Sequence, residues 1–318
     1  MKFAYDCQGG DRAPEAIVEG ALEAEKKLGI VAYFYGSEEI LKKMPNVARE
    51  RIVDAIEEIT QEESPAMAIR RKSKSAMVLA LKDLRDGKVD GMISAGSTGA
   101  LLAGGMFITG RIEGVERAAL PILLNGTMIL DVGANMDTTP EMLLSFGKMA
   151  RAYMIAVQEV SEPRVALLNV GAEEGKGNRQ TKEAFSLFQD AMPGFIGNAE
   201  ARDVFSQAAD IIVCDGFSGN ILLKGMEGVI GFVQRGFQSV LASGAYAPDV
   251  AQTVVAAAKQ AMGGLDYRRY GGAPLLGLKK PLIKAHGSSG PEAIFSASVS
   301  LQKMIDNNAI AIMEGEYR

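Results

Sequence analysis

The sequence predicts an α/β fold, a three-layer α/β/α Rossmann-like sandwich in which helices cover both faces of a mostly parallel sheet. Short apolar runs recur along all 318 residues, and they keep ending in a polar residue followed by glycine. Most of these runs are separated by segments with apolar residues at intervals of three and four, as in amphipathic helices. Because strands that alternate with helices pair in parallel, we expect one α/β domain over residues 1–318.

Seven apolar runs are predicted strands, and each leads into a loop that contains glycine. They are residues 3–5, 91–93, 128–130, 165–168, 195–196, 211–213 and 282–284. Residues 50–60 fit either a strand or a helix, and we interpret them as a strand.

Helical spacing fills most of the intervals between these strands. Asp11 can cap a first helix that has Pro14 in its first turn and ends between Leu28 and Gly29. Residues 75–84, 141–157 and 179–188 predict three more helices.

Two further helices are predicted at residues 225–243 and 248–262, as a hairpin excursion over residues 225–270. Packing inside the hairpin or against the core is the plain explanation of the broad apolar face on the first helix, and pairing with the same hairpin of a second subunit fits it nearly as well. Tyr246 is the one bulky apolar side chain at the expected tip, which gives little support for contact with a membrane surface.

Composition limits the classes of function. The net charge of −5 argues against a general nucleic-acid binder. Cys7 and Cys214 are too few for a disulfide framework, so a reducing cytoplasmic compartment is the simpler expectation. The chain contains one histidine and two cysteines, which are too few for the usual zinc site, and we expect no metal or other cofactor. No apolar run approaches the roughly 18 residues that suggest a membrane span.

The glycine loops together predict an anion site. In a parallel sheet the strand-to-helix loops emerge at the carboxyl edge, so all seven are expected to meet on one rim. Glycine lets backbone N–H groups approach a ligand, and the following helix points its positive end at it. A tight turn is the better explanation of any single glycine loop, but seven loops that also carry Asp, Asn, Ser or His favour a binding site.

Three common motifs are absent. No GxGxxG follows the first strand, so a dinucleotide site lacks its fingerprint. Residues 171–177 resemble a P-loop but are one residue short, with Gly177 in place of the magnesium-binding Ser or Thr. No GxSxG elbow presents a serine nucleophile.

Eight sequence blocks, in order, resemble those of the PlsX family, the acyl-carrier-protein:phosphate acyltransferases. They cover nearly the whole chain: residues 6–16, 94–115, 130–141, 168–182, 197–203, 214–224, 271–277 and 283–289. The chain departs from the family pattern at Cys7 and Gln8, where Ala and Met are usual, at Ser97, where Asn is usual, and at Ser218, where an apolar residue is common. Residues 120–128 are a shorter stretch than usual.

The resemblance implies transfer of a fatty acyl group from an acyl-carrier-protein thioester to inorganic phosphate, giving acyl-phosphate for phospholipid synthesis. It also implies a homodimer with a fold related to isocitrate and isopropylmalate dehydrogenases and to phosphotransacetylases. The implied partners are acyl-carrier protein, inorganic phosphate and a downstream glycerol-3-phosphate acyltransferase in the membrane. The expected location is therefore the cytoplasm, including the inner face of the membrane.

This chemistry needs anion binding more than a catalytic triad, because phosphate is already an anion and a thiolate leaves without strong acid assistance. We expect His286 to polarise the carbonyl or to protonate the leaving group, and Lys182, Asn178 and Asn220 to clamp phosphate. An isolated histidine is otherwise a structural hydrogen-bonding group, and Asn178 and Lys182 are otherwise a helix cap and a solvated lysine. The other predicted substrate-binding residues are Gly9, Gly10, Gly96, Ser97, Thr98, Gly99, Gly133, Asn135, Asn169, Gly171, Lys176, Asn198, Gly216, Lys224 and Ser288.

Carboxylates and thiols are expected to have supporting roles. A carboxylate beside phosphate would repel it, so Asp6, Asp11, Asp131 and Asp215 are predicted to cap helices and hold lysines or backbone amides. Cys7 and Cys214 are expected to be buried small residues and not sites of an acyl-enzyme. Basic residues at 70–72 with Lys74, at 268–269 and at 279–280 are either solvated or a docking patch for an acidic carrier protein.

Three alternatives remain open on the sequence. One is a nicotinamide-dependent dehydrogenase of the same fold, which lacks its fingerprint. A second is a shorter-chain phosphotransacetylase that uses a coenzyme A thioester. The third is a noncatalytic scaffold that binds acyl-carrier protein or an anion.

Overall fold

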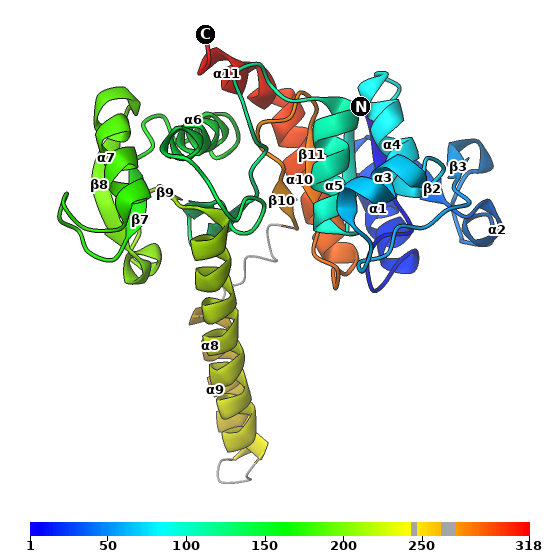
Figure 1. The fold of residues 1–318 in the computed structure, drawn as a ribbon. Coiled ribbons are helices and arrows are strands. Elements are labelled where there is room, and N and C mark those ends of the chain that lie inside the picture. The colour runs from blue at the N-terminus through cyan, green and yellow to red at the C-terminus, as the bar shows by residue number, and fades with distance from the viewer. Residues whose placement is uncertain (243–246, 262–270) are drawn as a thin grey trace.

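A computed structural model describes residues 1–242, 247–261 and 271–318 (Figure 1). Its strands form two sheets. The first sheet contains β1 (Lys2–Asp6), β2 (Val31–Gly36), β3 (Ile52–Asp54), β4 (Gly91–Ser94), β10 (Ala273–Pro274) and β11 (Leu282–Lys284). The second contains β5 (Pro121–Leu124), β6 (Thr127–Leu130), β7 (Val165–Asn169), β8 (Phe195–Glu200) and β9 (Ile211–Val213). All seven runs predicted as strands are strands, and residues 50–60 supply β3.

The expected single sheet is corrected to two, with spatial orders β10-β11-β4-β1-β2-β3 and β5-β6-β9-β7-β8. Among the described strands, β10–β11 and β5–β6 pair antiparallel and the other pairs are parallel. The mostly parallel α/β class is therefore confirmed. The two sheets approach each other at β10 and β5.

The helices follow the predicted spacing closely. They are α1 (Glu15–Leu28), α2 (Glu38–Leu41), α3 (Pro65–Arg71), α4 (Ala76–Arg85), α5 (Thr98–Gly104), α6 (Pro140–Val157), α7 (Arg179–Ala191), α8 (Gly216–Ala242), α9 (Pro248–Ala261), α10 (Pro291–Asp306) and α11 (Ala309–Gly315). Gly29, at a φ of 67°, ends α1 as predicted. The predicted cap at Asp11 is wrong: α1 starts after Pro14 without a side-chain cap, and the Asp11 N–H donates to the carbonyl of Gly287 at 2.8 Å.

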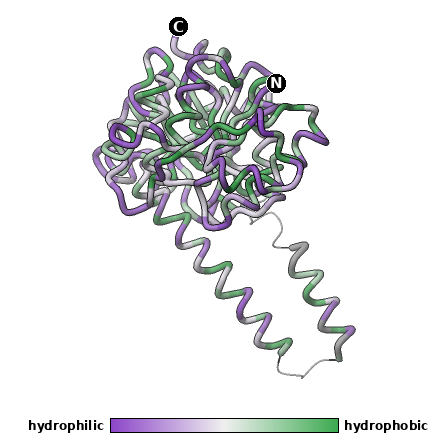
Figure 2. The backbone as a smooth tube through the Cα atoms, turned by 90° about the vertical axis from the view of Figure 1, so that its right-hand side faces the viewer, coloured by the Kyte–Doolittle hydropathy of each residue, from purple (hydrophilic) through white to green (hydrophobic). Residues whose placement is uncertain are grey.

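The predicted start of the first hairpin helix at residue 225 is also wrong, because α8 begins at Gly216, directly after β9. The carboxylate of Asp215 accepts hydrogen bonds from the Ser218 N–H at 2.7 Å and from its hydroxyl at 2.9 Å, which caps the first turn. One helix therefore runs from a strand-end loop out to the hairpin, which projects from the body of the molecule (Figures 1 and 2). The tip with Tyr246 and the basic pair at 268–269 lie outside the described residues.

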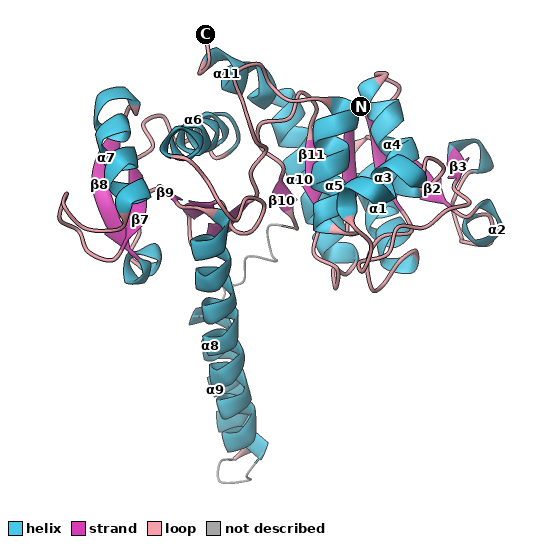
Figure 3. Ribbon diagram, in the orientation of Figure 1, coloured by secondary structure: helices cyan, strands magenta, loops and turns pink. Residues whose placement is uncertain are grey.

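Helices cover both faces of the first sheet (Figure 3). Successive residues of a strand point to opposite faces of its sheet. In β1, Tyr5 lies in the buried cluster that contains Ile17 of α1, and Ala4 lies in the cluster that contains Met77 of α4, so helices pack on both faces. The first of these clusters continues to Phe146 of α6 and joins the two sheets. This shared core supports our proposal of a single domain. None of the described helices has the length and apolar character to cross a membrane.

Candidate active site

A cavity of about 330 Å³ opens between the two sheets. Strand ends in both sheets contribute Thr98 after β4, Gly133 after β6, Asn220 and Lys224 on the first turns of α8, and Lys284, His286 and Ser289 at and after β11. Tyr153, Gln158, Glu227 and Ser300, on or next to α6, α8 and α10, add further polar groups to the lining of the cavity. Its apolar lining consists largely of Leu120, Pro121, Ile122, Leu123, Met128, Val132 and Leu223. Four of the seven predicted loops therefore meet here, as expected for the carboxyl ends of parallel strands.

His286 is held in one tautomer by its own loop. The backbone N–H of Ser288 donates to Nδ1 at 3.2 Å, and the Ser288 hydroxyl lies 2.9 Å from the same atom. Because Nδ1 accepts that N–H, the neutral ring carries its proton on Nε2. Nε2 is thus the atom that can donate a hydrogen bond to a substrate carbonyl. Ser288 thus orients the histidine, and its predicted contact with substrate stays a prediction.

Lys284 was not among the predicted site residues, although it lines the cavity two residues before His286. Its ammonium donates to the carbonyl of Ala95 at 3.4 Å and to the carbonyl of Ala285. Burial lowers the pKa of Lys284 to about 8, while the negative charges of Asp6 and Asp11 act in the opposite direction. The available signal was a lysine at the end of an otherwise apolar strand.

Asn220 and Lys224 lie one helical turn apart on α8 and both line the cavity. Lys224 forms an ion pair with Glu227 at 2.8 Å, and its side chain is largely exposed. Gly133 has a φ of 137° and lies opposite Asn220. A β-carbon added to Gly133 would lie 3.7 Å from the side-chain amide oxygen of Asn220. Thr98 starts α5, where the Ser97 hydroxyl caps the helix by accepting from the Ala100 N–H at 3.4 Å.

Three of the four predicted supporting carboxylates hold the loops in place. Asp6 accepts from the Ser94 hydroxyl at 2.6 Å and from the Gln8 N–H at 3.2 Å, and Asp215 caps α8. Asp131 accepts backbone N–H groups of Leu120, Gly133, Ala134 and Asn135 at 2.7 to 3.2 Å. Burial raises the pKa of Asp6 and of Asp131. The Asn135 amide donates to Asp131 and to the carbonyl of Ala118, both at 2.9 Å, so it supports the loop.

A second group of predicted residues lies away from the cavity, on loops of β7 and β8. Asn178 caps α7 by accepting from the Thr181 N–H at 2.9 Å, and Lys182 is exposed on that helix. Asn198 donates to the carbonyl of Glu173 at 2.9 Å, and its amide oxygen is buried without a hydrogen-bond partner in the described chain. Asn169, Gly171 and Lys176 belong to the same region. The single predicted rim is therefore divided into two clusters within one chain.

An apolar groove of about 810 Å³ adjoins this second cluster. Asn169, Asn178 and Asp215 line it together with Val170, Ile221, Val229 and other apolar side chains. Val170 and Val229 are 80% and 64% exposed, so the groove is an open apolar surface.

Several predicted glycines let loops pack against each other and do not line the cavity. A β-carbon on Gly9 would lie 2.5 Å from the Gly96 nitrogen, and one on Gly216 would lie 2.5 Å from the Asn135 carbonyl oxygen. Gly99 is similarly crowded by Pro65, and Gly10 has a φ of 107° beside Ala95. Close loop packing, which only glycine allows, therefore accounts for these glycines, and direct binding of the ligand by their backbones stays a prediction.

The two thiols are buried, Cys7 beside the carbonyl of Tyr5 and Cys214 beside the carbonyl of Asp131. Burial raises the pKa of both well above its ordinary value. Since the thiolate is the nucleophile, neither thiol is suited to form an acyl-enzyme.

Sequence and structure comparisons place the chain among known proteins. Residues 1–312 match the family described as fatty acid synthesis protein. A phosphate acyltransferase of Bacillus cytotoxicus is 41% identical over 327 residues, 99% of each chain, and one of Shouchella clausii is 42% identical over 314 residues, 96% of this chain and 95% of the relative.

Two solved structures share the fold at low identity. A phosphotransacetylase from Streptococcus pyogenes has a TM-score of 0.62 at 17% identity, with 96% of this chain and 94% of that chain covered. A 4-hydroxythreonine-4-phosphate dehydrogenase from Klebsiella pneumoniae has a TM-score of 0.51 at 14% identity, with 99% and 98% covered. The fold and the sequence matches agree, and the chain belongs to the fatty acid synthesis protein family, together with the phosphate acyltransferases whose sequence blocks it resembles.

Proposed function

We propose that the protein transfers a fatty acyl group from an acyl-carrier-protein thioester to inorganic phosphate and releases acyl-phosphate for phospholipid synthesis. One observation carries the proposal: a single cavity brings the cationic Lys284, the donor His286 and the amide of Asn220 beside an extended apolar wall. The polar groups suit an anion and a carbonyl, and the wall suits a hydrocarbon chain. The sequence relatives named phosphate acyltransferase support the same reaction.

The residues present are sufficient for this chemistry. A phosphate oxygen attacks the thioester carbon, the carbonyl becomes an oxyanion, and the carbon–sulfur bond breaks with its electron pair on sulfur. Hydrogen phosphate loses one proton and the thiolate gains one, so the reaction needs no further acid or base. His286 Nε2–H donates to the oxygen as its negative charge develops, which is the stage at which such a donor stabilises most.

The apolar part of the cavity favours a fatty acyl group over acetyl. Leu120, Met128, Val132 and Leu223 are among its lining residues. Each methylene removed from water contributes about 0.8 kcal/mol, so a long chain gains binding energy here that acetyl cannot. A shorter-chain phosphotransacetylase is the closest competing function.

One assay separates the candidates. The protein is incubated with phosphate and either palmitoyl-carrier protein or acetyl coenzyme A, and acyl-phosphate is trapped with hydroxylamine. Long-chain product supports the proposal, and acetyl-phosphate as the preferred product would assign a phosphotransacetylase. If neither thioester gives an acyl-phosphate, the remaining candidate functions are a binding scaffold and a dehydrogenase.

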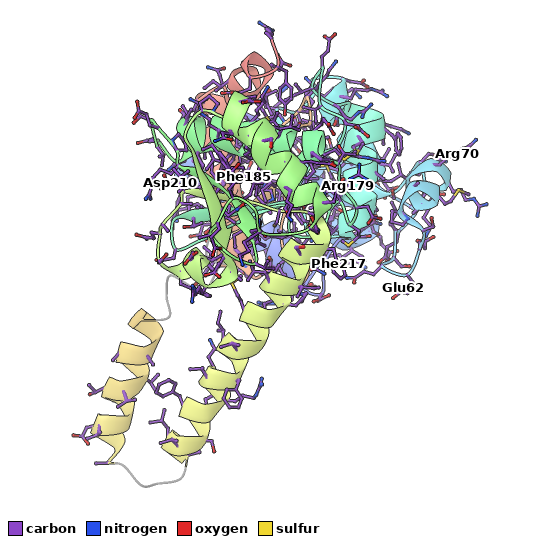
Figure 4. The ribbon with its side chains drawn as sticks, turned by 60° about the vertical axis from the view of Figure 1, so that its left-hand side comes forward. Glu62, Arg70, Arg179, Phe185, Asp210 and Phe217 are labelled. Atoms are coloured by element: carbon purple, nitrogen blue, oxygen red, sulfur yellow. The ribbon has the colours of Figure 1, made fainter. Side chains whose placement is uncertain are left out.

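We also propose a homodimer, located in the cytoplasm, that passes acyl-phosphate to a glycerol-3-phosphate acyltransferase in the membrane. Along α8, Phe217, Ile221 and Phe232 are 59%, 56% and 71% exposed, and a second copy would cover such a face. Figure 4 shows Phe217 where α8 leaves the body. Light scattering should give twice the chain mass, and a monomer at micromolar concentration would contradict the dimer.

In such a dimer, the cluster with Asn178 and Lys182 can complete the cavity of the partner subunit. Coexpression tests this idea with Lys182→Ala in one chain and His286→Ala in the other. If each site draws on both subunits, the mixed dimer recovers activity that neither parent variant has. If the mixture stays as inactive as its parents, the second cluster does not act across the interface.

A further inference from the structure

Three polar side chains stand in a row across the carboxyl edge of the first sheet. Strands β11, β4 and β1 are neighbours, and their parallel register pairs Lys284 with Ser94 and Ser94 with Asp6. Residues paired in this way on adjacent strands point to the same face. The sheet therefore places a carboxylate, a hydroxyl and an ammonium group side by side.

The carboxylate end of this row is fixed. Asp6 is 2% exposed, and it accepts the Ser94 hydroxyl at 2.6 Å. A buried carboxylate is costly unless it is hydrogen-bonded and balanced by positive charge. Asp11 adds a second negative group close to the loop after β11, since a β-carbon on Gly287 would lie 3.5 Å from its carboxylate oxygens.

The ammonium end of the row reaches the cavity. The carbonyls of Ala95 and Ala285 take two of the three N–H donors of Lys284, which leaves one donor for an anion. The other candidate cations are less suited. Lys224 is largely exposed and paired with Glu227, and Lys182 is exposed on α7, outside the cavity lining. A half-buried cation interacts with an anion more strongly than a solvated one, because the surrounding dielectric is lower.

We infer that Lys284 is the residue that binds the phosphate substrate, and that Asp6, acting through Ser94, positions it. The inference rests on the proposed function and assigns a role to a residue that lies in the last sequence block but was not among the predicted site residues. The inference also assigns a role to Asp6, because the negative charge of its carboxylate favours the protonated form of the half-buried Lys284 amine.

The same arrangement makes phosphate binding depend on pH. The ammonium is charged below a pKa of about 8 and loses its proton above it, so phosphate affinity should fall as pH rises past that value. The charged and titratable groups that face it are Asp6 of β1 and Asp11 of the following loop, and His286, Lys224 and Glu227 line the same cavity.

The test compares Lys284→Met and Lys284→Arg in the full chain, with Lys303→Met as the control at an exposed lysine of α10 outside the cavity lining. Lys284→Met should raise KM for phosphate by about 10- to 100-fold, the range for a lost charge-assisted hydrogen bond, and leave KM for the thioester unchanged. Lys284→Arg should retain part of the phosphate binding and lose the alkaline limb, because arginine stays charged. The control should match the wild type.

Each outcome decides. An unchanged phosphate KM in a folded Lys284→Met protein, or an alkaline limb near pH 8 that persists in Lys284→Arg, would overturn the inference. If Lys284→Met does not fold, the Arg profile decides alone. If the wild type makes no acyl-phosphate, the proposed function fails, and thermal stabilisation by inorganic phosphate still tests Lys284. Loss of this stabilisation in Lys284→Met but not in Lys303→Met supports the site, and its retention at full strength in both Lys284 variants refutes it.

Discussion

Gly219 in the first turn of α8 packs directly on the carbonyl of Asp131, so closely that a β-carbon at residue 219 would lie 1.9 Å from the oxygen. This contact fixes the start of α8, and with it Asn220, against the loop after β6. Gly219→Ala should therefore destabilise the protein by at least about 1–3 kcal/mol and lower activity, since the helix must shift. Urea unfolding measures the first effect and the acyl-phosphate assay the second.

Gly228 on the same helix is the matched control, because a β-carbon there would meet nothing within 4 Å. Gly228→Ala should stabilise the protein by up to about 1 kcal/mol through helix propensity alone. Equal effects of the two substitutions would contradict the proposed contact.

His286→Ala should leave the fold intact, because the side chain is exposed, and should lower kcat by about tenfold or more through loss of the Nε2 donor. Thermal melting checks the fold and steady-state kinetics the turnover. Ser288→Ala, which removes one contact to Nδ1, should have a smaller effect. Near-normal turnover of the alanine variant would remove His286 from the mechanism.

Asp6→Asn should shift the alkaline limb of the pH profile. The Asp6 charge favours the ammonium form of Lys284, so its removal lowers that pKa further below about 8. The fall in kcat/KM for phosphate should then begin at a lower pH than in the wild type. Asp86→Asn, at an exposed carboxylate paired with Arg85, should not move the limb. An unmoved limb in Asp6→Asn would show that the two groups are not coupled.

The basic end of α3 is a candidate docking surface for the carrier protein. Arg70 and Arg71 are exposed, and Figure 4 shows Arg70 extending outward. Helix α3 packs against α5, whose first residue, Thr98, lines the cavity. Charge reversal of both arginines to Glu should raise KM for the carrier thioester and leave KM for phosphate unchanged.

Two further pairs complete the docking experiment. Reversal of Lys42 and Lys43, after α2, is the control and should have no effect. If charge reversal of Lys279 and Lys280 raises KM for the carrier thioester more than reversal of the arginines does, the docking surface lies on the loop that contains Lys279 and Lys280.

Much of the fold followed from the sequence, because periodicity and helix ends are local properties. Gly29 ends α1 as predicted, and α4 begins directly after Ser75, close to the start that apolar spacing predicted. The division into two sheets was not predictable in this way, because alternation of strands and helices does not specify which strands are neighbours. Strand β5 did have a local signal, the Asn125-Gly126 dipeptide with φ of 48° and 87°, which marks a tight hairpin into β6.

The site was predicted less completely. His286, Asn220, Lys224, Thr98 and Gly133 do line one cavity, as the common edge of parallel strands requires. Lys284 escaped notice because only the β11–β4–β1 register places its side chain with Asp6. The separation of Lys182 from His286 also depends on strand order, which the sequence pattern does not contain.

The pairing of β4 with β11 has a consequence for synthesis. Met92 and Leu282 are partners in this ladder, so one edge of β4 has no native neighbour until most of the chain has left the ribosome. An unpaired strand edge is a template for association with other chains. Polypeptides that end before residue 282 lack Lys284 and His286, and they should aggregate through the open edge of β4. The last tenth or so of the chain therefore completes the active site and also closes the edge that promotes aggregation.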